Sequence, residues 1–194
     1  METVRFRQGA GRLCLDFIRT LRYRGTASPT EELGDAHALA DWVRQCGPCG
    51  ADSAVPLPAE VDVEETHVLR EAIHDLISAV REGGEAGSCG RGAREEINRA
   101  AAGEVPVPRL EASGSIQWRA DDPVRATLAL VARDALDLVT SPAVTRLRNC
   151  AGPDCGAIFL DNSRPGTRRW CSMDTCGNRA KKETLRSKTA SSGH

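Results

Sequence analysis

Apolar side chains recur every three or four positions along much of the chain, and this spacing predicts amphipathic helices that share a core. The pattern is strongest over three segments: residues 31–45, 60–81 and 123–140. Asp122 and Pro123 are typical of a helix start, and Ser141-Pro142 of a helix end. A shorter helix is predicted over residues 93–102, after a glycine-rich linker.

Alternation of apolar and polar residues predicts the β-structure. Residues 105–112 and 115–120 alternate on either side of a Ser-Gly-Ser turn, which predicts a β-hairpin. Residues 3–18 hold two short β-prone runs around Gly9-Ala10-Gly11. These runs predict a hairpin or a strand that leads into a helix, with Cys14 buried in a strand.

The predicted elements divide the chain into two parts. Residues 1–141 are expected to form a mainly α body with a small antiparallel β-sheet, an α+β arrangement. Residues 142–190 are expected to form a four-cysteine zinc-finger module. Within this module, residues 157–163 are predicted as a strand and residues 164–171 as its returning arm.

The composition supports a folded protein and excludes a membrane span. Of 194 residues, 40% are hydrophobic and 27% are charged, which allows one domain with a small appendage. No apolar run approaches the ~20 residues that cross a bilayer. Arginines interrupt the N-terminal segment, so no secretion signal is visible and a cytoplasmic location is expected.

The net charge of −1 conceals an asymmetry between the two parts. Residues 141–194 carry ten Lys and Arg against four Asp and Glu, a net charge of +6. The first 140 residues carry sixteen against twenty-three, a net charge of −7. A basic module for an anionic partner, attached to an acidic body, would produce this distribution, and so would a solvated basic tail.

Four of the eight cysteines lie close together in the basic part. Cys150, Cys155, Cys171 and Cys176 have the spacing C-x4-C-x15-C-x4-C. Two such pairs can complete a tetrahedral shell of four thiolates around one Zn2+. A module of about 45 residues has little core of its own, and structural zinc supplies the stability that such a core lacks. Because four thiolates close the shell, this zinc is expected to be structural rather than catalytic.

Other chemistry-bearing patterns favour less specific interpretations. Cys46-Gly47-Pro48-Cys49 resembles a redox pair, but it follows a predicted helix instead of beginning one. Glu64, His67, Glu71 and His74 share one face of the helix over 60–81; a solvated face is favoured over a metal or acid/base site. Common catalytic and nucleotide-binding motifs are missing from the sequence, so the protein is not expected to be an enzyme.

The segment after Cys176 predicts a basic helix, with Asn178 as its N-cap. Arg179, Lys182 and Arg186 fall at i, i+3 and i+7 on one face, which suits contact with a phosphate backbone. Alternatively, Arg179 could brace the module internally, against Asp161 or Asp174. Arg168 and Arg169 on the returning arm add positive charge. The predicted nucleic-acid-binding residues are therefore Arg168, Arg169, Asn178, Arg179, Lys182 and Arg186.

Residues 142–188 closely resemble the CGNR zinc finger, named for the Cys-Gly-Asn-Arg that stands here at residues 176–179. RRWCSM and CGNRAK match together with all four cysteines. The segments GRLCLDFIRTL and SIQWRADDPVRATLALVARDALDLV resemble the opening and closing motifs of the ABATE domain, from a family of proposed stress-induced transcription regulators. Arg19 departs from this family, which more often has Asn there. The resemblance implies zinc at the four cysteines and a DNA-binding role in transcription.

These observations lead to one hypothesis and two alternatives. The hypothesis is a zinc-binding transcription regulator whose C-terminal module binds DNA and whose body senses a ligand or mediates assembly, with a homodimer expected on grounds of affinity. Asp16, Trp118 and Arg119 are the candidates for a body pocket. The first alternative is an RNA-binding or protein-interaction module with purely structural zinc. The second makes the body an enzyme.

Overall fold

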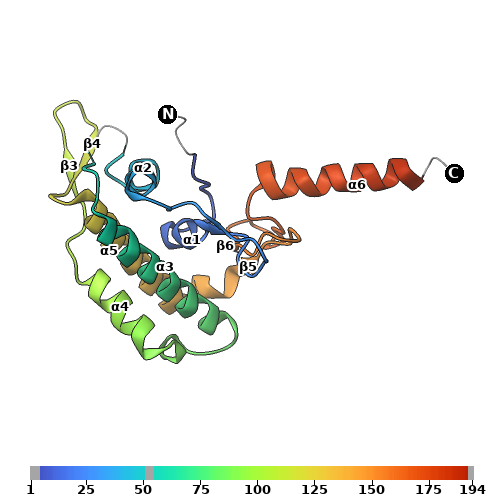
Figure 1. Ribbon diagram of the computed structural model, residues 1–194, viewed down its shortest axis with the longest axis horizontal. Helices are drawn as coiled ribbons and strands as arrows, with labels where there is room; N and C mark the ends of the chain where they lie inside the picture. The colour runs from blue at the N-terminus through green and yellow to red at the C-terminus, as the bar shows by residue number, and fades with distance from the viewer. Residues whose placement is uncertain (1–4, 51–54, 192–194) are drawn as a thin grey trace.

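The computed structural model describes residues 5–50 and 55–191, and five α-helices form most of the body (Figure 1). They are α1 (Leu13–Ile18), α2 (Ala36–Cys46), α3 (Glu60–Arg81), α4 (Arg91–Ala101) and α5 (Pro123–Thr140). Helix α3 packs against both α4 and α5, and α5 also contacts α1 and α2. The apolar stripes of α3 and α5 meet in the core, where Ile73, Ile77, Val131 and Leu138 are fully buried. Helical periodicity therefore predicted the main body helices correctly, with α3 confirmed at both ends.

Acidic caps set the starts of three body helices. Asp122 accepts hydrogen bonds from the backbone N–H groups of Val124 (3.1 Å) and Arg125 (3.0 Å), as its position before Pro123 predicted. Asp35 accepts from Ala38 N at 2.8 Å and starts α2 at Ala36, five residues later than predicted. Asp62 accepts from Ala59 N at 2.9 Å at the start of α3.

Within the described residues, the β-structure consists of three separate antiparallel pairs. They are β1 (Leu21–Arg22) with β2 (Thr30–Glu31), β3 (Val107–Leu110) with β4 (Ile116–Arg119), and β5 (Leu147–Asn149) with β6 (Ile158–Leu160). The β3–β4 hairpin confirms the predicted turn, and it stands at the edge of the body in Figure 1. Short helical turns connect other elements: η1 (Ala86–Ser88), η2 (Pro142–Arg146) and the π-helical η3 (Met173–Gly177).

Two predicted strands are wrong. The β-prone run at Leu13–Ile18 is helix α1, and Cys14 is buried in that helix, where its backbone N–H donates to Asp134 Oδ2 at 2.8 Å. A short apolar run does not distinguish a buried strand from a buried helix turn, and here the contact with α5 decides. Residues 3 and 4 of the predicted first run lie outside the described residues.

The returning arm over 164–171 is also not a strand. Strand β6 pairs instead with β5, with Asn149 opposite Ile158, so its partner precedes the first cysteine. Pro165 lacks an N–H for a ladder, and Gly166 turns the chain with φ +64°. The arm is held by side-chain bonds that the sequence pattern does not reveal.

One continuous core joins the body to the cysteine-rich segment. Leu147, Ile158, Phe159 and Leu160 are buried in the same cluster as the body helices. The connection is close at Gly11, which has φ +98°: a Cβ there would lie 3.0 Å from Leu160 Cβ. The division of the chain into two domains between residues 141 and 142 therefore stays a prediction, and the two parts share one hydrophobic core.

Helix α6 (Asn178–Ser191) extends away from the rest of the molecule (Figure 1). Its side chains from Lys181 to Arg186 are all exposed. In the part of the chain that the structure describes, no helix combines the length and apolar character needed to span a bilayer.

Candidate metal centre and its surroundings

The sulfur atoms of Cys150, Cys155, Cys171 and Cys176 all lie within 4.8 Å of one another. Cys155 Sγ is 3.6 Å from Cys171 Sγ and 3.6 Å from Cys176 Sγ, and Cys171 Sγ is 3.7 Å from Cys176 Sγ. Four thiolates around tetrahedral Zn2+, with Zn–S bonds of about 2.3 Å, have sulfurs about 3.8 Å apart. The sulfur positions and the all-thiolate donor set therefore fit one structural Zn2+ with a closed shell.

Two backbone turns bring the cysteine pairs together. Cys150 follows β5 and donates its N–H to Ala157 O (2.9 Å), and Cys155 N donates to Gly152 O (3.1 Å), so the first pair lies on a tight turn. The second pair lies on the loop into η3, where Cys176 N donates to Ser172 O at 3.1 Å. The second turn leads directly into α6, so a metal ion that holds Cys176 also fixes the start of that helix.

Hydrogen bonds and burial shift the pKa values of the cysteine thiols in opposite directions. Donation by the thiols of Cys155 and Cys171 lowers the pKa of Cys150 far below its usual value, and the Cys171 N–H also donates to Cys150 Sγ at 3.3 Å. Burial, together with the neighbouring thiol of Cys155, raises the pKa of Cys176 to about 11. Because zinc binds thiolates, loading the cluster must release protons.

Arg19 is a contact to this cluster that the sequence did not predict. Its side chain is buried, donates to Cys171 Sγ at 3.7 Å and pairs with Asp16 Oδ1 at 3.4 Å. Asp16 also accepts from the N–H groups of Gly9 (3.1 Å) and Ala10 (2.9 Å). Asp16 therefore positions a loop and Arg19.

Arg168 is engaged inside the protein. Its guanidinium donates to the carbonyls of Trp170 (2.8 Å), Gly9 (3.0 Å) and Cys171, and lies over the Phe159 ring. The backbone N–H of Arg168 donates to buried Asp161 Oδ2 at 3.0 Å. These bonds tie the loop before Cys171 to the body, so Arg168 braces the module. Arg169 is exposed, with its guanidinium carbon 5.3 Å from the Trp170 ring centre.

The other predicted nucleic-acid-binding residues meet at the start of α6. Asn178, Arg179, Lys182 and Arg186 line one surface hollow of about 530 Å3, which Asp154, Asp174 and Glu183 also border. Asn178 is not the predicted N-cap: it has helical φ −68° and ψ −34°, and its Nδ2 donates to Asp174 O at 3.3 Å. Arg179 lies beside the Tyr23 hydroxyl, and this contact raises the pKa of Arg179. Asp161, one suggested partner of Arg179, is occupied by Ser163 and Arg168 N.

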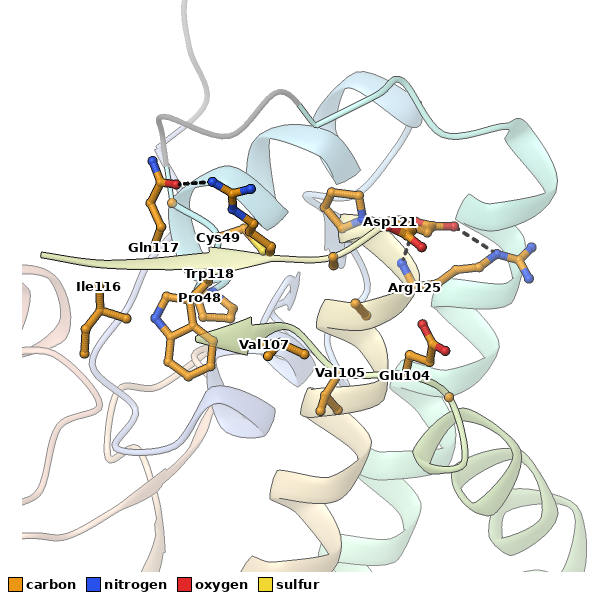
Figure 2. A pocket seen from close by; sticks show the side chains of 17 residues that line it. Pro48, Cys49, Glu104, Val105, Val107, Ile116, Gln117, Trp118, Asp121 and Arg125 are labelled. Atoms are coloured by element: carbon orange, nitrogen blue, oxygen red, sulfur yellow. Dashed lines mark hydrogen bonds and ion pairs between the residues drawn. The ribbon is translucent and has the colours of Figure 1, made fainter. Parts of the chain in front are cut away.

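Trp118 and Arg119 line a cavity of about 900 Å3 between the β3–β4 hairpin, the end of α2 and the start of α5 (Figure 2). Trp118 lies on the same side of β4 as Pro48, whereas Gln117 points to the opposite side and accepts from Arg119 at 3.2 Å. The structure therefore brings two of the three predicted pocket residues together and leaves Asp16 elsewhere.

The polar face of α3 is not simply solvated. Glu31 accepts two hydrogen bonds from buried Arg70, at 2.6 and 2.5 Å, and Glu71 pairs with Arg70 (3.0 Å) and Arg24. His67 Nε2 contacts Leu33 O at 2.8 Å. Of the four residues assigned to a solvated face, Glu64 alone is exposed. The sequence signal that could have revealed this network is Arg70, a charged residue within the apolar stripe of α3.

Cys46 ends α2, at the opposite end of a helix from a redox cysteine. Burial raises the pKa of its thiol to about 11, although a hydrogen bond from Gln8 Nε2 at 3.4 Å opposes the shift. This geometry disfavours disulfide exchange at Cys46-Gly47-Pro48-Cys49.

Comparison with known families gives two matches that together span most of the chain. Residues 11–142 match ABATE, described as a putative stress-induced transcription regulator. Residues 146–189 match the CGNR zinc finger. No curated protein matches the chain. Neither family description names an enzymatic activity.

Proposed function

Because the chain belongs to the ABATE family and ends in a CGNR zinc finger, we propose that it is a transcription regulator that binds DNA through this finger. The observation that carries the proposal is the exposure of Arg179, Lys182 and Arg186 on a helix that begins two residues after Cys176. At 1.5 Å per residue, the three cations span about 10 Å of helix. This length suits contacts to several phosphates of one groove.

The zinc, when bound, holds four thiolates and supplies rigidity rather than reactivity. Consecutive residues of the chain then orient the helix. Cys176 fixes the turn, Gly177 lets the buried backbone pass close to Met173, and α6 leaves the body with its cationic face exposed. Arg168 holds the preceding loop onto the body through Gly9 O, so the helix has a defined direction relative to the whole molecule.

We assign the sensing or assembly role to the body. The cavity at Trp118 is the candidate ligand site, with apolar walls from Pro48, Val105 and Ile116 and an acidic rim at Asp121 and Asp122. A homodimer would place two α6 helices on one DNA molecule, which compensates for the weak binding of a single basic helix.

The test is fluorescence anisotropy of zinc-loaded protein with labelled duplex DNA, single-stranded DNA and RNA over a salt series. Duplex binding should weaken with salt. In the Arg179→Ala/Lys182→Ala/Arg186→Ala variant, the slope of log K against log salt concentration should be smaller in magnitude by about 3. Arg91→Ala/Arg94→Ala/Arg99→Ala on exposed positions of α4 removes the same charge and is the matched control. Preference for RNA would support the alternative module, and no binding to any probe would leave the zinc purely structural.

A further inference from the structure

Tyr23 occupies a strained position where the body reaches α6. It follows β1, and its φ of +55° is the only positive value among the non-glycine residues that the structure describes. Arg22 Nη2 donates to the Tyr23 hydroxyl at 2.9 Å, and the Arg22 guanidinium carbon lies 4.9 Å from the ring centre. Arg22 is itself held by Glu32 at 3.0 Å. The strained backbone therefore presents a hydroxyl group that is fixed in place by a paired cation.

Two more arginines lie near Tyr23 and come from distant parts of the chain. Arg179 lies beside the Tyr23 hydroxyl and is the largest cause that lowers the pKa of Tyr23, and the charges of Arg22 and Arg7 act in the same direction. Arg7 and Tyr23 line one small hollow together with Cys155. Arg7 also lines the cleft of about 1020 Å3 that Ser172 and Thr175 of the zinc-binding loop border. Arg7 thus lies at the boundary between the body and the zinc module.

Two of the three arginines near Tyr23 form no ion pair within the described residues. Whereas Arg22 pairs with Glu32, neither Arg7 nor Arg179 has a carboxylate within 4.0 Å among the described residues. Two guanidinium groups and one phenolic O–H are hydrogen-bond donors that suit the anionic oxygens of a phosphate. Arg179 also lines the hollow of Lys182 and Arg186, so a phosphate at Tyr23 would be continuous with contacts along α6.

We propose that Arg7, Tyr23 and Arg179 together bind one phosphate of the DNA backbone, so that the body contributes directly to the nucleic-acid surface. This inference rests on the proposed function and adds to it a contact outside the zinc finger. Arg7 and Arg179 supply the charge, and Tyr23 lies beside Arg179 and donates its O–H. A phosphate contact carries no base readout, so its contribution is the same for every DNA sequence.

The test measures binding of the zinc-loaded full-length protein to labelled duplex DNA of random sequence over a salt series. Arg7→Ala should bind about fivefold more weakly near physiological salt and lower the logarithmic salt slope by about 1, the effect of one lost phosphate contact. Arg91→Ala is the matched control: Arg91 is exposed on α4 and pairs with Glu95, and its replacement removes the same charge. Tyr23→Phe should weaken binding without changing the slope, because it removes a donor but no charge.

Circular dichroism and zinc content must match the wild type for each variant. If Arg7→Ala and Tyr23→Phe bind like Arg91→Ala while the α6 triple variant loses binding, this inference is wrong and the proposed function stands. If the wild-type protein binds no duplex DNA, the proposed function fails first. A loss of affinity in Arg7→Ala that varies with DNA sequence would also overturn the assignment to a phosphate.

Discussion

Arg19, which follows α1, donates to the sulfur of Cys171 across 3.7 Å, although the two residues lie 152 positions apart in the sequence. A zinc ion with four thiolates carries a net charge of −2, and a buried guanidinium beside one sulfur offsets part of it. Asp16 holds Arg19 at 3.4 Å and also binds two backbone N–H groups of the preceding loop. The metal cluster is therefore supported by the body as well as by its own turns.

Removal of this cation should weaken zinc binding. Arg19→Ala is expected to lower zinc affinity by about 10- to 100-fold, as for other residues that contact metal ligands, while Arg19→Lys retains part of it. Competition with a chromophoric chelator measures the affinity directly. An Arg19→Ala protein with wild-type zinc affinity would show that the Arg19–Cys171 contact has no energetic role.

Zinc removal should destabilise the body together with the module. Leu147, Phe159 and Leu160 lie in the core that the body helices build, so loss of the metal loosens contacts on both sides. We expect chelation to lower the melting temperature of one cooperative transition, followed by circular dichroism at a helical wavelength. An unchanged body transition with separate loss of the zinc module would instead support two independent folding units.

The sequence predicted those elements whose pattern repeats over several turns. Helices α3 and α5 were predicted because their apolar residues repeat at helical spacing over many turns, and the β3–β4 hairpin because its sequence has a strong turn signal. Helix α1 was not predicted, because six mostly apolar residues are too few to show helical spacing. Strand β6 was predicted to pair with the segment that follows it, residues 164–171, whereas hydrogen bonds join it to β5, which precedes the first cysteine pair.

The candidate site was predictable only where spacing specifies the chemistry. Four cysteines in two pairs specified the metal ligands. The arginines gave no such signal, since Arg168 and Arg179 belong to similar basic runs, yet the first binds carbonyl groups inside the protein and the second is exposed. The roles of Arg19 and Tyr23 depend on contacts between distant segments, which no local pattern contains.

The Glu31–Arg70 pair should make stability depend on pH. Burial opposes ionisation of Glu31, but hydrogen bonds from Arg70 outweigh it and hold the pKa below its usual 4.5. A lowered pKa contributes stability above about pH 4.5 that is lost as the pH falls through the folded-state value. Because Arg70 is 2% exposed, Glu31→Gln should cost about 2 kcal/mol at neutral pH and progressively less in acid.

Urea unfolding between pH 3 and 7 measures the difference in the free energy of unfolding between wild type and Glu31→Gln. This difference should disappear over roughly one to two pH units as the pH falls. Glu64→Gln, at an exposed position of α3, is the control and should be nearly neutral. A cost that stays constant with pH would show that the carboxylate charge of Glu31 does not stabilise the fold.

Cys46 should react slowly with alkylating agents. Burial raises the pKa of its thiol to about 11, so at neutral pH the reactive thiolate is only about one part in ten thousand. The rate of iodoacetamide modification, followed by mass spectrometry with Cys46→Ser as control, should rise about tenfold per pH unit toward that value. Fast modification at pH 7 would contradict the helix-end geometry and revive a redox role.

Replacing Tyr23 with glycine should separate stability from binding. The left-handed conformation at φ +55° costs a side-chain-bearing residue about 1 kcal/mol, which glycine avoids. The loss of the Arg22 contact and the greater freedom of the unfolded chain offset this gain, so the free energy of unfolding should stay within about 1 kcal/mol of the wild type. DNA affinity should nevertheless fall as far as in Tyr23→Phe, because the Tyr23 hydroxyl is gone. Tyr23→Val, which keeps the strain and lacks the hydroxyl, should lose both stability and affinity. Wild-type DNA binding by Tyr23→Gly would mean that the Tyr23 side chain has no part in binding.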